Sequence, residues 1–206
     1  MDLNFIGFGY LFLRLAPFVL ASFFTLASIF NQDWKGVIYL VGLLFSSFIT
    51  VLSSKLPWIS SLEAPQDRPG ICNILSFSNS DILSDLPLSI SAISYTFAYL
   101  LFFIIIYKNG KENIPTLVFF PLLIIFDLIW NFTTGCYSFF QLLISITIGT
   151  AIGVLWAYIL STTNSPHLTY FNTLSTKEVC SVASKQTFKC KVYKNGKLIS
   201  KNIGGA

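Results

Sequence analysis

The chain has 206 residues, of which 54% are hydrophobic and only 11% are charged. A soluble domain carries roughly 25% charged residues, and a soluble core of this size has too little volume to hide so many Phe, Leu and Ile side chains. The composition excludes an ordinary soluble globular protein and predicts an integral membrane protein.

The charges divide the chain into two parts. Residues 1–161 contain six Lys or Arg and eight Asp or Glu, a net charge of −2, whereas residues 162–206 contain seven Lys and one Glu, a net charge of +6. We predict a transmembrane helical domain over 1–161 and a basic C-terminal tail over 162–206. Because no recognition motif accompanies the lysines, we expect no nucleic-acid partner.

Five stretches are long and apolar enough to cross a bilayer, which takes about 20 residues of helix. Arg14 lies in the first of them and Asp127 in the fourth, and the other three carry no charge. The fold class that follows is an all-α integral membrane bundle of about five transmembrane helices. The predicted spans are 8–30, 36–54, 87–107, 114–130 and 139–161.

The two charges within the spans require an explanation. A charge at membrane depth costs several kcal/mol unless it is paired or reaches the interface. Because the first and fourth spans run in opposite directions, Arg14 and Asp127 both fall near the same side of the membrane. We predict that they form an intramembrane pair or line a polar cavity, and the alternative is that each reaches the interface independently.

The connections between the spans predict an orientation. The side that receives residue 2, the polar loop 55–86 and the turn 131–138 carries two basic residues against five acidic ones, and the opposite side carries ten lysines against three. The positive-inside rule then places the tail in the cytoplasm, and the N-terminus and the loop on the extracytoplasmic or luminal side of a cellular or viral membrane. Cys72 and Cys136 share that side, where an oxidising compartment would permit a disulfide.

The tail carries a signal for a small β-hairpin. Apolar and lysine side chains alternate over 188–193, as in a half-buried strand, and Asn195-Gly196 is a strong two-residue turn signal. Leu198 and Ile199 then begin the return strand. The four cysteines of the chain form no CxxC pair and its one histidine is His167, so we predict no metal site.

Arg68-Pro69 lies in the loop after the second span, Pro87-Leu88-Ser89-Ile90-Ser91 begins the third span, and the last span contains Gly149 and Gly153. In the order of these features, residues 36–160 resemble the type-2 phosphatidic acid phosphatase and vanadium haloperoxidase superfamily. Arg68-Pro69 matches the end of the first family motif, and residues 87–91 align with the second. Gly149 and Gly153 follow the glycine rhythm after the third motif. They also form a GxxxG pair, which predicts close packing of the last span within the bundle.

The resemblance implies a catalytic site whose chemistry is missing. Arg68 is retained, but other side chains stand where the family has its lysine, its two histidines, its arginine and its aspartate. Ile90 can neither give nor take a proton, and Tyr137 is a poor phosphate nucleophile near neutral pH. We therefore expect no catalytic residue and no cofactor. The replacements are Ser61, Ile90, Asn131, Tyr137 and Gln141.

The sequence favours a catalytically inactive phosphatase-like membrane protein. It would bind a lipid head group through Arg68, Asn131 and Tyr137, bind a partner, or serve as a structural membrane protein whose tail docks other membrane or structural proteins. The alternatives are an active lipid phosphate phosphatase with a divergent site, and a transporter or channel built on Arg14 and Asp127.

Overall fold

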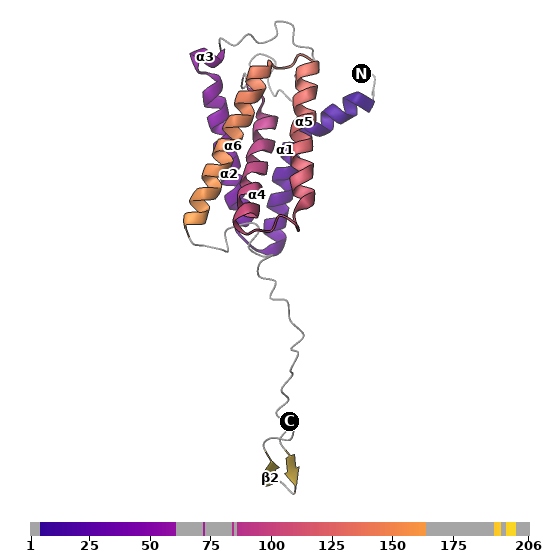
Figure 1. Ribbon diagram of the computed structural model, residues 1–206, viewed down its shortest axis with the longest axis vertical. Helices are drawn as coiled ribbons and strands as arrows, with labels where there is room; N and C mark the ends of the chain where they lie inside the picture. Colours follow the sequence, from indigo (N-terminus) through magenta and orange to yellow (C-terminus); the bar gives the residue numbers. More distant parts are fainter. Residues whose placement is uncertain are drawn as a thin grey trace. The chain divides into compact units, whose positions relative to one another are not determined.

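The computed structural model describes residues 5–60, 72, 84, 86–163, 192–194 and 197–200 (Figure 1). The chain divides into two compact units, Met1–Thr173 and Leu174–Ala206. The first unit contains the whole of the predicted transmembrane domain.

The first unit is a bundle of α-helices. Among the described residues, five of them are long and apolar enough to cross a membrane, by length and composition, which matches the five predicted spans and is consistent with a multi-pass membrane protein. The sequence did not predict the short helix α3. The helices are α1 (Phe5–Asn31), α2 (Lys35–Ser54), α3 (Pro57–Ser60), α4 (Leu88–Ile106), α5 (Ile114–Thr133) and α6 (Phe139–Thr162).

Successive long helices run in opposite directions, so the bundle has two ends that can be followed in Figure 1. The lysine end contains residues 32–34, between α1 and α2, with Lys35 at the start of α2, and residues 107–113, between α4 and α5. The other end is called the disulfide end, after the bond between Cys72 and Cys136. It contains residues 55–60, residues 86–87 before α4, and residues 134–138 between α5 and α6. Each loop between consecutive described helices therefore lies on the side that the sequence predicted.

Helix α4 is the core of the bundle, and α6 packs closely along it. A Cβ atom on Gly149 would collide with the carbonyl oxygen of Ser91, and one on Gly153 would stand 2.6 Å from the carbonyl oxygen of Tyr95. Only glycine permits this approach of two backbones, so the predicted packing role of the GxxxG pair is confirmed.

Buried hydroxyl groups join α2 to α4. The hydroxyls of Tyr39 and Thr96 are 2.6 Å apart, and those of Thr50 and Ser91 are 2.8 Å apart. Tyr95 also donates to the backbone carbonyl of Tyr39 at 3.2 Å. Such hydrogen bonds hold apolar helices together where lipid supplies no hydrophobic drive between them.

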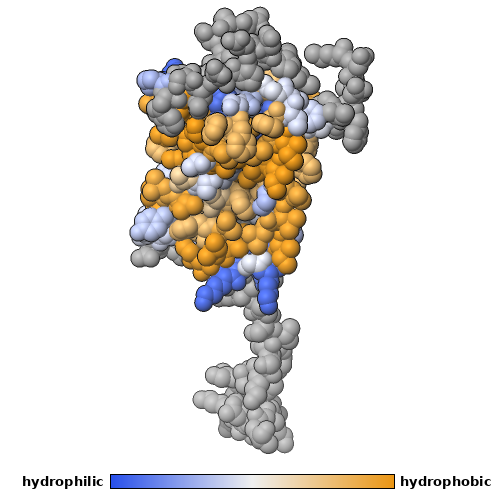
Figure 2. Space-filling view, turned by 45° about the horizontal axis from the view of Figure 1, so that its top comes forward, coloured by the Kyte–Doolittle hydropathy of each residue, from blue (hydrophilic) through white to orange (hydrophobic). Residues whose placement is uncertain are grey.

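The outer surface of the bundle suits a bilayer. Figure 2 shows that the described surface is largely hydrophobic between polar ends. Large apolar side chains point outward from α1, α2, α5 and α6, which is the reverse of a soluble protein and the expected arrangement against lipid. Examples are Phe18, Phe30, Leu44, Phe126 and Phe140.

The second unit contains two short strands, β1 (Val192–Lys194) and β2 (Lys197–Ser200). They pair antiparallel, with Tyr193 opposite Leu198 and Lys194 opposite Lys197. Both strands fall within the predicted hairpin. Its turn at 195–196 and residues 188–191 lie outside the described residues.

Candidate functional site

The disulfide end is tied together by a bond between Cys72 and Cys136, which are 64 positions apart in the sequence. Cys136 lies in the turn after α5, and its N–H donates to the carbonyl of Asn131 at 3.0 Å. Gly135 has a φ of +67°, a conformation that favours glycine and lets the chain reverse there. The structure therefore contains the disulfide that the sequence permitted.

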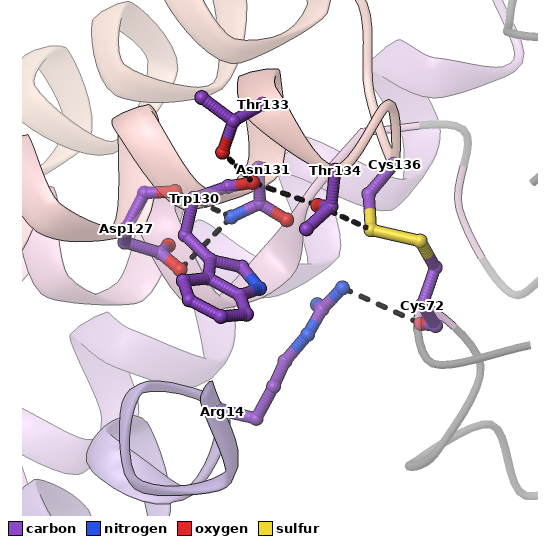
Figure 3. The surroundings of a disulfide bond; sticks show 8 residues. All are labelled: Arg14, Cys72, Asp127, Trp130, Asn131, Thr133, Thr134 and Cys136. Atoms are coloured by element: carbon purple, nitrogen blue, oxygen red, sulfur yellow. Dashed lines mark hydrogen bonds between the residues drawn. A yellow bond between two sulfur atoms is a disulfide. The ribbon is translucent and has the colours of Figure 1, made fainter. Parts of the chain in front are cut away.

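Arg14 reaches from α1 toward this disulfide (Figure 3). Its guanidinium donates to the carbonyl oxygen of Cys72 at 3.4 Å and stands 5.8 Å from the centre of the Tyr137 ring. A guanidinium at this distance from an aromatic face is attracted by the ring quadrupole. One cation thus contacts both the disulfide-linked Cys72 and the ring of Tyr137.

Asp127 is fully buried on α5 and receives hydrogen bonds from two side chains. Ser89 at the start of α4 donates to Oδ2 at 3.1 Å, and Asn131 one turn further along α5 donates to Oδ1 at 2.9 Å. The positive charge of Arg14 is near enough to attract the carboxylate. A buried carboxylate requires compensation of this kind. Whether Arg14 and Asp127 form a direct ion pair stays a prediction.

The start of α6 is fixed to the start of α4 at the same end. Ser145 donates to the carbonyl oxygen of Pro87 at 2.7 Å. Ser138 and Gln141 form a capping box, in which the N–H of Ser138 donates to Oε1 of Gln141 at 2.9 Å. Gln141 therefore has a structural role at the first turn of the helix.

The predicted site residues that the structure describes differ in burial and in contacts. Asn131 and Gln141 are buried and hydrogen-bonded to neighbouring groups, Ile90 is fully buried, and Tyr137 is half-buried beside Arg14. Ser61 and Arg68 lie outside the described residues.

The described side chains of the disulfide end can bind a polar ligand. They include the Arg14 cation, the Asp127 carboxylate, the amides of Asn131 and Gln141, and the Ser89 hydroxyl. Ile90 has no group that exchanges a proton. Within the described ranges, no group of three His, Cys, Asp or Glu side chains is placed to hold a metal ion.

Sequence reasoning named Asp127, Asn131 and Gln141 but missed the hydrogen bonds that they make within this cluster. Asp127 and Asn131 are four positions apart on a predicted helix, and this spacing places two side chains on one face. The Ser138–Gln141 spacing is likewise a recognisable capping signal. Ser89 and Ser145 gave no such signal, because their contacts cross between helices.

Asn131 also heads an Asn-Phe-Thr sequon, but its side chain is fully buried. The amide nitrogen, which is the atom that a glycan would be attached to, donates to Asp127, so the folded chain uses it for an internal contact.

No family model, no curated protein and no solved structure matches this chain. The resemblance to the phosphatase superfamily therefore stays a prediction.

Proposed function

We propose that this chain is a catalytically inactive, phosphatase-like membrane protein that binds the polar head group of a membrane lipid at its disulfide end. The observation that carries the proposal is the contact of Arg14 with Tyr137 and Cys72, beside the buried Asp127 and Asn131. The described surface between the ends of the bundle is largely hydrophobic, so Arg14 and Asn131 would offer a cation and an amide near the level of the head groups.

The disulfide supports an extracytoplasmic location for this site. Disulfides form and persist in oxidising compartments. Among the described residues, Lys35, Lys108 and Lys111 lie at the opposite end and only Lys55 lies at this one, which is the bias that the positive-inside rule uses. The head group would then belong to a lipid of the extracytoplasmic or luminal leaflet.

The loss of catalysis is supported by the side chains at the motif-equivalent positions. The one histidine of the chain is His167, which follows α6 and so belongs to the cytoplasmic side in the proposed orientation. Phosphoryl transfer by the family mechanism needs a histidine nucleophile and a proton donor at the site. Binding needs neither.

The test combines turnover with lipid retention. The purified chain in detergent should release no inorganic phosphate from a panel of lipid phosphates and diphosphates, and native mass spectrometry should detect retained phospholipid. Arg14→Gln should lose the lipid, whereas Lys55→Gln, which removes an exposed cation at the same end, should keep it. Size-exclusion and thermal-unfolding profiles establish that both variants are folded.

Two results would overturn the proposal. Phosphate release that disappears in Arg68→Ala would make the chain an active phosphatase. If the folded Arg14→Gln variant still retained lipid, or if the unmodified chain retained none, the proposed head-group site would be wrong.

The tail supports a second role as a docking element for another membrane or structural protein. Residues 174–206 form a compact unit with their own paired strands, and this part of the chain carries seven lysines. A chain ending at Thr173 should still enter the membrane but lose cross-links to its partner. Cross-links that persist in this truncated chain would place the docking surface on the bundle instead.

A further inference from the structure

The orientation of the Asn131 amide is fixed by its two acceptors. Its Nδ2 donates to the backbone oxygen of Asp127 at 2.7 Å and to the Oδ1 of the same residue at 2.9 Å. Turning the amide over would place its oxygen against these two oxygens, so the hydrogen-bond network assigns the nitrogen to Asp127. The Oδ1 of Asn131 must then face the other way, as Figure 3 shows.

This carbonyl oxygen has no hydrogen-bond partner in the described part of the chain, although it is fully buried. More than nine in ten buried polar groups are paired, so an unpaired acceptor in a native fold requires an explanation. A donor from outside the chain would supply the missing bond. Asp127 stands directly behind the amide, and its negative charge favours a donor that is polarised or positive.

The depth of Asn131 restricts where such a donor comes from. The residue lies two positions before the end of α5, in the last turn of a helix long enough to cross a bilayer. That turn lies at the level of the head groups rather than of the acyl chains. Trp130, the adjacent residue, belongs to a type enriched at this level.

We infer that Oδ1 of Asn131 accepts a hydrogen bond from the ammonium or hydroxyl group of a phospholipid head group, while Arg14 receives its phosphate. This inference rests on the proposed function and specifies the ligand. The family motif has an arginine where this chain has Asn131, so the replacement exchanges a phosphate donor for an acceptor. The head group that fits therefore carries a donor next to its phosphodiester.

This chemistry separates head groups that are otherwise alike. Ethanolamine, glycerol and inositol lipids carry N–H or O–H donors beside the phosphate. Choline lipids have the same phosphate and the same positive charge as ethanolamine lipids, but their quaternary ammonium has no N–H. A site built around an unpaired acceptor should reject the ligand that cannot donate.

The experiment uses the full chain with equimolar ethanolamine and choline lipids of identical acyl chains. We expect native mass spectrometry to show a preference for ethanolamine of about tenfold, equivalent to 1.4 kcal/mol. Asn131→Leu removes the acceptor at similar volume, and it should retain both lipids equally while still depending on Arg14. A parallel arm with glycerol lipid distinguishes a hydroxyl from an ammonium donor.

A methylation series tests the inference without any variant. Mono- and dimethylated ethanolamine lipids still carry an N–H, so retention should fall only at the third methyl group, where the last donor is lost. Equal retention of ethanolamine, glycerol and choline lipids by the unmodified chain would overturn the inference but leave the proposed function standing. Retention of no phospholipid would overturn both.

Discussion

Ser89 at the start of α4 donates a hydrogen bond to the Asp127 carboxylate on α5, with 3.1 Å between Oγ and Oδ2. Asn131 donates to the other carboxylate oxygen, and Arg14 on α1 attracts the same group. The carboxylate is therefore the point at which three helices converge at the disulfide end.

Asp127→Ala should lower the free energy of unfolding by about 1–3 kcal/mol. The substitution leaves the Ser89 hydroxyl without its acceptor, deprives Asn131 of one of two acceptors, and removes the negative charge that offsets Arg14. Ser89→Ala is the matched control and should cost less, about 0.6 kcal/mol, as single interhelical hydrogen bonds in membrane proteins do. Equilibrium unfolding in mixed detergent micelles measures both losses.

Equilibrium unfolding also tests whether Arg14 and Asp127 stabilise one another. If the two charges stabilise one another, Arg14→Ala should restore part of the stability lost in Asp127→Ala, because it removes a cation left without compensation. Strictly additive losses in the double variant would show that the two charges act independently.

The disulfide should stabilise the end of the bundle at which it lies. Closing a loop of 64 positions restricts the unfolded chain by up to about 4 kcal/mol in the chain-entropy account. Cys136→Ser should lower the thermal midpoint and abolish its sensitivity to reductant, whereas Cys190→Ser should leave that sensitivity intact. Alkylation of both Cys72 and Cys136 in the unreduced chain would contradict the bond.

The orientation can be measured with two exposed lysines at opposite ends of the bundle. Lys55 lies at the disulfide end and Lys111 at the lysine end. In a chain whose Cys180 and Cys190 are replaced by Ser, a membrane-impermeant maleimide should label Lys55→Cys on intact cells or sealed vesicles. It should label Lys111→Cys only after permeabilisation. The reverse pattern would place the disulfide end in the cytoplasm.

The helices of this fold were predictable because crossing a bilayer demands only length and apolarity. The same argument missed α3, a single turn with no such demand. The packing role of the glycines at 149 and 153 was also predictable, since close helix packing requires small residues at that spacing.

The site was only partly predictable. Arg14 and Asp127 stood out because charges are rare within spans, and Asn131 and Tyr137 emerged from the family resemblance. The contact of Ser89 with Asp127 depends on the register between α4 and α5, and that of Arg14 with Cys72 on the path of a loop. Neither register nor path is encoded in a local pattern.

The packing of α6 on α4 predicts a strong dependence on two glycines. Gly149→Ala and Gly153→Ala should each cost about 1–3 kcal/mol, because the added methyl group meets the backbone of α4, which cannot move aside as a side chain would. Gly110→Ala is the control, since a Cβ there meets nothing within 4 Å. Thermal unfolding of the three variants in one detergent ranks them, and equal midpoints would contradict the packing.

For two buried serines in the middle of the bundle, we expect that substitution does not destabilise the fold. The hydroxyls of Ser46 on α2 and Ser94 on α4 are buried without a hydrogen-bond partner in the described part of the chain. Along the two helices they lie between two pairs of hydrogen-bonded hydroxyls, Thr50 with Ser91 and Tyr39 with Thr96. An unpaired buried hydroxyl costs free energy, so its removal should be neutral or stabilising. Ser46→Ala and Ser94→Ala should therefore keep or raise the thermal midpoint.

Thr50→Ala is the informative comparison for these serines. It removes a hydroxyl paired with that of Ser91 and should lower stability by about 0.6 kcal/mol, up to roughly 1.7. If Ser46→Ala or Ser94→Ala lost as much as Thr50→Ala, a water molecule bound between α2 and α4 would be satisfying the two serines. The double variant Ser46→Ala/Ser94→Ala would then lose no more than either single variant, because one shared water would account for both losses.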